Sequence, residues 1–438
     1  MRAMLTGAAL GVVLGGLAVG VSSIGWSESS PSQTRQETYR QLDLFAEILS
    51  RAQNEYVEQI DEAEAMEAAI NGMLTSLDPH SGYLAPEEFR SMQVQASGEY
   101  GGLGIEVTME DGFLKIVSPM DDSPASRARL QSGDLITAVD GSPVIGQSVS
   151  DAVKDIRGPV GTDIVLTIMR TGQEPFDVTL QREVIRPKSV TWRADDNNIA
   201  YIRISTFNDR TTELLDEAVE GIEAELGQPN GIILDLRNNG GGLLDQAVSV
   251  SDMFLSGGEV VSTQGRRQTD VERYNARAGE VFRDVPIVVL INEGSASASE
   301  IVAGALQDRG RAKVVGMTSF GKGSVQTVIP LGAEKGAIRL TTARYYTPAG
   351  RSIQTTGIEP DIEIANRIFT DEDLAARNQW TEADLPNALN NEEGVERREA
   401  HIPFDQPPAD YEGEDYQLDR AMAVLLGTYT RAETPNAG

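Results

Sequence analysis

The chain has 438 residues, a hydrophobic content of 40%, no cysteine and a formal net charge of −30. This length predicts two or three domains, and the apolar content is enough for sizeable cores. The charge argues against nucleic-acid binding and against an anionic lipid surface, and the absence of cysteine excludes disulfides, thiolate-bound zinc and a lipoprotein anchor.

The N-terminal segment has the pattern of an export signal. Arg2 precedes an apolar run over residues 4–24 that ends among small residues. The pattern predicts a signal peptide or an uncleaved anchor over residues 1–25, and the run is about long enough to span a bilayer, so both interpretations stay open; a buried core helix is the alternative. We therefore expect an exported protein, periplasmic or anchored to the outer side of the inner membrane.

Residues 27–35 predict a short linker, and residues 36–95 predict a helical region. Apolar side chains recur there at three- and four-residue spacing, which is typical of amphipathic helices. They form two stripes: Leu42, Phe45, Ile48 and Leu49, then Met66, Ala69, Ile70, Met73, Leu74 and Leu77. Asp78 and Pro79 predict the end of the second helix.

Residues 98–185 predict a small α+β domain or a partly open barrel. Short apolar runs are separated by turns that contain Gly, Asp or Pro. The predicted strands cover residues 103–108, 113–117, 135–139, 164–169 and 176–180, with a helix at 150–157.

Residues 190–365 predict an α/β core in which strands alternate with helices. The predicted strand–helix pairs are 199–204 with 211–226, 231–236 with 243–255, and 286–292 with 298–307. Such repeats indicate a sheet covered by helices. We expect the helical region, from residue 38 to 95, to pack on this core.

Residues 366–415 carry 14 acidic residues and four arginines. Few apolar residues and repulsion between like charges predict a solvated, poorly ordered segment. A last amphipathic helix at 418–426, within residues 416–430, is expected to dock on a domain.

A candidate nucleophile lies in the sequence NEGSASASE, residues 292–300. An apolar strand ends there and a helix begins, so the free N–H groups and dipole of the helix N-terminus favour a developing oxyanion. Ser295, Ser297 and Ser299 are candidates by type. Helix capping, a common role of serine, is the alternative.

Lys322 is a candidate general base because it lies between two glycines in SFGKGS and is one of only six lysines. A lysine acts as a base only when neutral, and burial lowers its pKa. With no cysteine and two histidines, a Ser-Lys pair is the most economical nucleophilic arrangement. The alternative is a surface or phosphate-binding lysine, although P-loop spacing is absent.

Two glycine-rich turns offer free backbone N–H groups. The turn at 238–242 follows an apolar strand and could supply a second oxyanion donor, or could simply need positive φ. The turn at 98–105 leads into a strand whose edge could bind a peptide and its terminal carboxylate. The residues predicted to bind this tail are Gly102, Leu103, Gly104 and Ile105.

Neither histidine is expected to be catalytic: His80 predicts a structural role, and His401 lies in the acidic segment. The spacing of His, Asp and Glu suggests no metal site, and we expect no cofactor.

These motifs together resemble the carboxyl-terminal processing peptidases, or tail-specific proteases, of peptidase family S41. The resemblance covers about residues 38–365 and includes LDPHSGYL, LDLRNNGGGLL, GSASASEI, SFGKGSVQ and RYYTPAGRSIQTTGIEPD in the family's order. It implies a crotonase-like α/β protease core with an inserted PDZ domain. By motif, Ser297 is the nucleophile, Lys322 the base and Gln326 the residue that orients the lysine, while backbone amides at Gly241 and Ala298 form the oxyanion hole.

The resemblance also implies an activity and its partners. Family members cut proteins near their C-termini after the PDZ domain captures the tail. We therefore expect protein substrates with exposed C-terminal tails, among them envelope proteins that are processed or degraded. An adaptor protein and a homo-oligomer are further expected partners.

Two residues depart from the family pattern. Gly240 stands where the family often has proline, and Arg129 stands where it usually has glycine. If position 129 has positive φ, arginine adds strain of about 1 kcal/mol or more. These two departures support one rival function, an inert PDZ scaffold.

A second rival is a different hydrolase or an acyl-CoA enzyme of the crotonase-like class, which shares the glycine oxyanion loop. A coenzyme A enzyme would need neither a PDZ module nor an export signal.

Overall fold

A computed structural model describes residues 31–430 apart from residues 111, 121, 333, 371, 373–380, 397–400 and 404. The chain divides into two units, residues 1–67 and residues 68–438. The predicted signal or anchor at residues 1–25 lies outside the described residues. Within the part that is described, no helix is both long and apolar enough to cross a membrane.

The first unit contains helix α1, Pro31–Glu55. The helix starts inside the stretch predicted as a linker, and Pro31 suits a first helical position because proline lacks the N–H that would be unbonded there. The predicted stripe is helical, but Leu42, Phe45 and Ile48 are 57%, 39% and 57% exposed. The stripe therefore accounts for the helix without building a core in this unit. Helix α2, Glu62–Thr75, begins in the same unit.

In the second unit, β1 (Gly82–Leu84) and α3 (Pro86–Ser97) follow α2. The segment between α2 and β1 is folded around Asp78, whose Oδ1 accepts the backbone N–H groups of His80 and Ser81, both at 2.9 Å. Helix α3 ends where Gly98 adopts φ 69°, a left-handed conformation that glycine tolerates.

Residues 100–185 form a β-rich module in which the five predicted strands and the predicted helix lie within two residues of their expected bounds, while the short strands β2, β6 and β9 were not predicted. Its sheet has the order β3-β4-β5-β7-β8, with β6 paired to β5, and β2 pairs with β9. Alternate apolar side chains, such as Leu114 and Ile116, are fully buried. The elements are β2 Tyr100–Gly102, β3 Ile105–Glu110, β4 Phe113–Pro119, α4 Pro124–Arg127, β5 Leu135–Val139, β6 Ser142–Pro143, α5 Val149–Ile156, β7 Asp163–Met169, β8 Phe176–Gln181 and β9 Glu183–Ile185.

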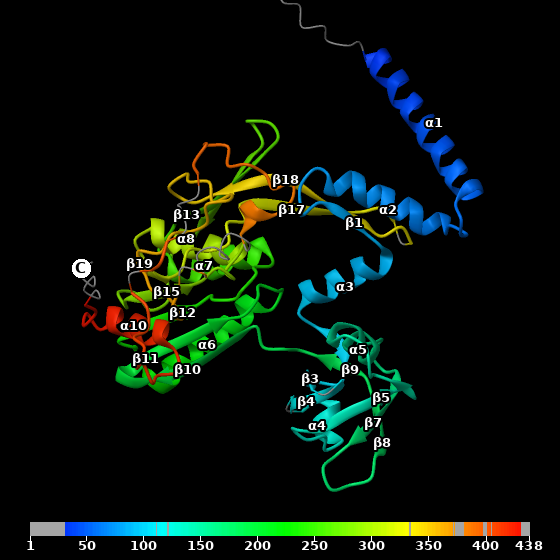
Figure 1. Cartoon of the computed structure of the whole chain (residues 1–438). Helices are drawn as coiled ribbons and strands as arrows, with labels where there is room; N and C mark the ends of the chain where they lie inside the picture. Colours follow the sequence, from blue (N-terminus) through cyan, green and yellow to red (C-terminus); the bar gives the residue numbers. More distant parts are fainter. Residues whose placement is uncertain are drawn as a thin grey trace, which may run out of the picture. The chain divides into compact units, whose positions relative to one another are not determined.

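A six-stranded sheet of order β10-β11-β12-β15-β16-β19 forms the α/β core (Figure 1). The pairs from β11 to β19 are parallel, and β10 is antiparallel to β11. Strand β11 and helix α6 match the predicted bounds, and β12, α7, β15 and α8 lie within one residue of theirs. The elements are β10 Val190–Asp195, η1 Asp196–Asn198, β11 Ile199–Ile204, α6 Thr211–Leu226, β12 Gly231–Asp235, α7 Leu244–Phe254, β15 Ile287–Ile291, α8 Ala298–Asp308, β16 Ala312–Gly316 and β19 Ile362–Glu363.

Both faces of this sheet are buried, which explains why its strands are continuous apolar runs. On one face, Ile202, Leu234 and Val289 belong to the core that also includes residues of α6, α7 and α8. On the other face, Ile233 and Leu290 pack with residues of α10, Tyr416–Leu425. The prediction that a C-terminal helix docks on a domain is confirmed.

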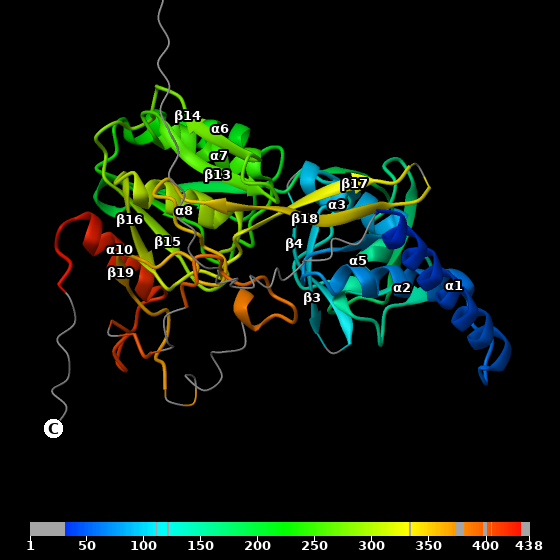
Figure 2. The ribbon, with the colours of Figure 1, turned by 90° about the horizontal axis from the view of Figure 1, so that it is seen from above.

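A second sheet escaped the sequence analysis. It has the order β1-β18-β13-β14, with β17 paired along the other edge of β18. Figure 2 shows β17 and β18 as a long hairpin. The strands are β13 Gly258–Gly265, β14 Val271–Ala276, β17 Ser324–Pro330 and β18 Ala337–Tyr346.

The prediction of a poorly ordered acidic segment is wrong for several of its described residues. Thr381, Glu382 and Asp405 are 4%, 0% and 1% exposed. Glu382 begins a single turn of 3-10 helix, η3 (Glu382–Asp384), and Asp405 accepts hydrogen bonds from Tyr416, Arg420 and Tyr429. Composition alone predicted solvent exposure, because it does not show that these acidic groups pair with residues of other elements.

Candidate functional site

Ser297 lies in the turn between β15 and α8, at the N-cap position of α8. Its backbone has φ 58° and ψ −114°, an unfavourable conformation for a residue with a side chain. The strain is held by a carboxylate, because the Ser297 N–H donates to Glu300 Oε2 at 2.7 Å. A strained residue at the start of a helix presents its hydroxyl outward from the sheet.

The structure separates the three candidate serines. Ser295 and Ser299 are both 0% exposed. The Ser295 hydroxyl donates to the Leu236 carbonyl at 2.9 Å, and the Ser299 hydroxyl donates to the Asn239 carbonyl at 2.8 Å. These two serines tie the turn to the loop after β12, so helix and loop stabilisation explains them, whereas Ser297 lines a cavity.

Lys322 lies in the loop between β16 and β17, where neighbouring backbone comes too close for side chains. A Cβ on Gly323 would lie 2.6 Å from the Gln354 nitrogen, and one on Gly321 would lie 3.0 Å from the Thr355 carbonyl carbon. The flanking glycines are therefore required by close packing of backbone around the lysine.

The environment of the Lys322 amine favours its neutral form. Burial is the main influence and lowers its pKa. The Glu382 carboxylate is the largest opposing influence and raises the pKa, whereas the Arg339 cation lowers it. Glu300 and Asp78 raise it by smaller amounts. The net direction is downward, as general-base catalysis by a lysine requires.

Glu300 connects the serine turn to the lysine turn, and the sequence analysis did not identify it. Its Oε2 accepts the N–H groups of Ser297 at 2.7 Å and of Lys322 at 3.0 Å. Its Oε1 accepts the Gly321 N–H at 2.7 Å and the Ser319 hydroxyl at 2.6 Å. Burial raises the pKa of Glu300 to about 7. The S-x-x-E spacing of a capping box was the available signal.

The glycine turn after β12 lies against the serine turn. A Cβ on Gly241 would lie 2.8 Å from Ser297 Cβ and 2.9 Å from the Ala298 nitrogen, and Gly241 has φ 97°. Glycine is required there for both reasons. The Gly241 N–H donates to Asn239 Oδ1 at 2.9 Å, so this predicted oxyanion donor is already bonded within the protein.

Two asparagines, which sequence reasoning passed over, lock these turns together. The Asn238 N–H donates to Asn292 Oδ1 and the Asn292 amide donates to Asn238 Oδ1, each at 2.8 Å. A Cβ on Gly240, in contrast, would point into open space, with no atom within 4 Å. Packing therefore does not require glycine at position 240, where the family often has proline.

Gln326 lines the same cavity as Ser297 and Lys322. Its amide donates to Ser324 Oγ at 3.0 Å and to Thr341 Oγ1 at 3.2 Å, rather than to Lys322. Thr341 Oγ1 in turn donates to Asp78 Oδ1 at 3.0 Å. Among the hydrogen bonds of the described residues, none joins Lys322 Nζ to Ser297 Oγ or to Gln326.

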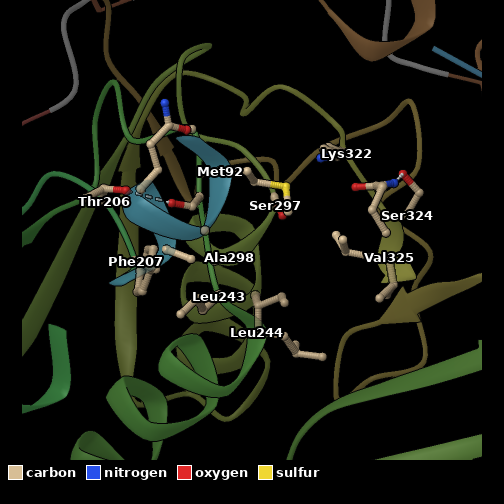
Figure 3. A pocket seen from close by; sticks show the side chains of 18 of the residues that line it. Met92, Thr206, Phe207, Leu243, Leu244, Ser297, Ala298, Lys322, Ser324 and Val325 are labelled. Atoms are coloured by element: carbon tan, nitrogen blue, oxygen red, sulfur yellow. Dashed lines mark hydrogen bonds between the residues drawn. The ribbon is translucent and has the colours of Figure 1, made fainter. Parts of the chain in front are cut away.

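The predicted catalytic residues meet in a cavity of about 590 Å³ (Figure 3). Ser297, Lys322, Gln326, Gly241 and Ala298 all line it. Its other walls mix apolar with polar side chains; the apolar ones include Met92, Phe207, Leu243, Leu244, Ile301, Val325 and Val328, and the polar ones include Gln95, Thr206, Ser324, Arg339 and Tyr345. Convergent polar groups in a cavity whose walls are partly apolar are typical of a site that binds a ligand.

The residues predicted to bind a peptide tail lie elsewhere, at the start of β3. Strand β3 is at one end of the module's sheet and contacts helix α5. Gly104 has φ 71°, and a Cβ there would lie 2.3 Å from Ser123 Cβ, so glycine is required. Arg129 has φ 58°, which satisfies the condition for strain at that departure.

The histidines are held by carboxylates: His80 Nε2 lies 2.8 Å from Glu382 Oε2, and His401 Nε2 lies 2.7 Å from Glu363 Oε2. Neither histidine lines the cavity. Over the described ranges, no group of three or more His, Asp and Glu residues is arranged to hold a metal ion.

Comparison with known proteins identifies the family. Residues 198–364 match the model of peptidase family S41, residues 101–180 match a PDZ domain, and residues 19–88 match the N-terminal domain of the activating protease CtpB. Over 426 residues the chain is 45% identical to the carboxy-terminal-processing protease of Bartonella bacilliformis, covering 96% of each protein. The chain belongs to peptidase family S41.

This S41 peptidase is a serine-type enzyme with a PDZ domain, and the resemblance stated from its motifs is confirmed. It is also 37% identical over 361 residues to a CtpA-like serine protease of Staphylococcus haemolyticus, covering 82% of this chain and 71% of that protein. Among solved structures, the photosystem II D1 C-terminal processing protease is similar, with 29% identity, a TM-score of 0.44, and coverage of 78% of this chain and 92% of that one.

Proposed function

We propose that this peptidase cleaves proteins near their C-termini with Ser297 as nucleophile and Lys322 as general base. One observation carries the proposal: a strained serine at a helix N-terminus shares a cavity with a buried lysine whose pKa is lowered. A base must be neutral at the working pH, and burial supplies that condition without a histidine.

The chemistry follows from these two groups. Neutral Lys322 takes the Ser297 hydroxyl proton while Oγ forms a bond to the peptide carbonyl carbon. The carbon–nitrogen bond then breaks, and the amine leaves with the proton from the Lys322 ammonium. Water, losing a proton to Lys322, attacks the acyl-enzyme, and the Ser297 oxygen regains the proton as the shortened protein departs.

The oxyanion is assigned to the backbone N–H groups of Gly241 and Ala298. Support comes from the close approach of Gly241 to Ser297 and from the position of Ala298 at the start of α8. Because the Gly241 N–H donates to Asn239 Oδ1, it has to change partner before it can bind an oxyanion. We assign the unbonded Ser297–Lys322 arrangement to a resting state, in which Gln326 is held by Thr341 and not yet by the lysine.

Tail capture is assigned to the PDZ domain. A substrate's C-terminal residues would add as a strand along β3, with the terminal carboxylate on the amides of Gly102, Leu103, Gly104 and Ile105. The edge position of β3 and its packing against α5 support this assignment. We propose that docking of the tail converts the resting state into one in which Lys322 reaches Ser297.

The natural substrates are proposed to be envelope proteins with flexible, apolar tails. The apolar part of the cavity wall supports apolar tails, and the sequence of residues 1–25 supports export. We also propose that the core has a crotonase-like fold. Its parallel strands and the glycine turn beside Ser297 support this proposal. An adaptor and a homo-oligomer stay predictions.

The test is a cleavage assay read by intact mass. A model protein that ends in a flexible apolar tail is incubated with the wild-type chain, Ser297→Ala and Lys322→Ala. We expect only the wild type to shorten the tail. Binding without cleavage by all three would favour a scaffold, and hydrolysis of thioesters but not peptides would favour an acyl-CoA enzyme.

A further inference from the structure

A buried carboxylate from the C-terminal segment lies beside the lysine turn. Glu382 is in η3, beyond residue 364, where the match to the S41 family model ends. Its side chain is only 1% exposed. Burying an ionised carboxylate costs several kcal/mol unless it is paired and hydrogen-bonded, so its partners decide what it does.

Glu382 holds the lysine turn on both sides of Lys322. Its backbone N–H donates to the Phe320 carbonyl at 3.2 Å, two residues before the lysine. Its Oε1 accepts the Gln354 amide at 3.1 Å, and Gln354 Oε1 accepts the N–H of Gly323 at 2.9 Å, one residue after the lysine. The backbone on both sides of Lys322 is thus bonded to Glu382, directly at Phe320 and through Gln354 at Gly323.

The other oxygen of Glu382 reaches the segment after α2. His80 Nε2 lies 2.8 Å from Glu382 Oε2, and the His80 carbonyl accepts from Arg339 Nε at 2.8 Å. Arg339 lines the catalytic cavity. One carboxylate therefore links the C-terminal segment, the segment after α2, strand β18 and the lysine turn.

We propose that Glu382 is a positioning residue for Lys322: it fixes the lysine turn through Phe320 and Gln354, and it supplies a buried negative charge close to that turn. This inference rests on the proposed role of Lys322 as base. It assigns to the C-terminal segment, which composition describes only as acidic, a direct part in setting the catalytic geometry and the pH at which the enzyme works.

The charged groups that face the lysine come from four elements. They are Glu382 of η3, Glu300 of α8, Arg339 of β18 and Asp78 of the turn after α2. Glu382 exerts the largest of these charge effects and raises the pKa of Lys322 against the effect of burial. His80 faces Glu382 and Tyr345 donates its hydroxyl to the Lys322 carbonyl.

The direction of the pH effect follows. When the Glu382 charge is removed, burial and Arg339 act with less opposition, and the pKa of Lys322 falls further. The neutral base then exists at lower pH. The acidic limb of the profile of kcat/KM against pH, which reports the base of the free enzyme, moves to lower pH. A purely structural role for Glu382 would lower the rate without moving the limb.

The experiment compares Glu382→Gln, Glu382→Asp and Glu393→Gln with the wild type, using the full chain and the tailed model protein. Glu393→Gln is the matched control, because it removes the same charge from an exposed position of the same segment. We expect E382Q to move the acidic limb to lower pH and E393Q to superimpose on the wild type. If the acidic limb of E382Q coincides with that of the wild type, the proposed effect of the Glu382 charge on Lys322 is wrong.

The aspartate variant tests positioning and decides the matter if E382Q does not fold. The shorter side chain keeps the charge but cannot reach both His80 and Gln354, so we expect an unmoved limb and a plateau rate lower by about 10-fold, the equivalent of one charged hydrogen bond. An E382D plateau equal to that of the wild type overturns the positioning role. If Lys322→Ala retains activity, the proposed function fails first; if Lys322 is essential and the E382Q limb is unmoved, only this inference fails.

Discussion

The turn that carries Ser297 and the turn that carries Lys322 are built in different ways. The serine turn is held mainly by Glu300, three residues after Ser297, and by one other segment, the loop after β12. The lysine turn is held by Glu300, Tyr345, Gln354 and Glu382, which come from separate elements. The nucleophile is thus placed mainly by a helix start and one neighbouring loop, whereas a base whose pKa must be lowered needs burial by residues from several elements.

The largest effect is expected from removing the proposed nucleophile in the serine turn. Ser297→Ala should lower kcat by about 10⁶-fold, because the proposed nucleophile that forms the acyl-enzyme is lost. Ser295→Ala is the matched control: it leaves the Asn292 N–H without its 3.0 Å partner, so we expect a lower melting temperature, equivalent to about 1–3 kcal/mol, with most of the activity retained. Activity of S297A near the wild-type level would contradict the assignment of the nucleophile.

On the lysine side, Lys322→Arg replaces the neutral amine with a permanent cation and removes the base. Guanidinium does not deprotonate in proteins, so we expect kcat/KM to fall by at least about 10³-fold over the whole pH range. Lys335→Arg, at an exposed position, should leave the rate unchanged. A measurable acidic limb that survives in K322R would assign the ionisation to a different group.

Glu300 joins the two turns, and its effect is expected in stability against pH. Its pKa in the folded protein is about 7, above the ordinary value of 4.5, so the folded state binds the proton more tightly than the unfolded state. This contribution to stability is present below pH 4.5 and is lost as pH rises towards 7, by on the order of 3 kcal/mol. Denaturant unfolding of Glu300→Gln across this range should show a flatter dependence; an unchanged slope would contradict the shift.

The smallest effects compare one glycine from each turn. Gly323→Ala brings a Cβ to 2.6 Å from the Gln354 nitrogen, so we expect destabilisation by about 1–3 kcal/mol and a lower kcat. Gly240→Ala meets no atom within 4 Å, so its melting temperature and kcat should stay close to those of the wild type. Equal effects of the two substitutions would remove the distinction between a tightly enclosed lysine turn and a looser serine-side loop.

The sequence predicted those parts of the fold that depend on local pattern. The strands β11, β12 and β15 are continuous apolar runs because both faces of their sheet are buried, and the helices between them begin and end near the predicted residues. The second sheet escaped because β17 and β18 are half-exposed and mix polar with apolar residues. Such strands are defined by their partners rather than by an apolar run.

In the candidate site, too, residues in local motifs could be predicted and residues with distant partners could not. Ser297 and Lys322 could be selected from short motifs, and the structure brings them into one cavity. Glu300 carried a local signal that fits simple helix capping equally well. Glu382 carried none, because its partners His80 and Gln354 are 302 and 28 residues away, and its acidic neighbours predicted solvent exposure. Long-range pairing of a buried charge leaves no trace in local composition.

Helix α10 also bears on the order in which a newly made chain can mature. It covers a sheet face that includes Ile233 and Leu290, and Arg237 next to that face pairs with Asp415 at the start of the helix. During translation, helix α10 is synthesised only after more than four hundred preceding residues. Until then the sheet face that α10 covers is an exposed apolar surface, of the kind that promotes aggregation and is bound by chaperones and quality-control proteases. A prematurely terminated chain would keep that surface, so complete translation becomes a condition for surviving as an enzyme.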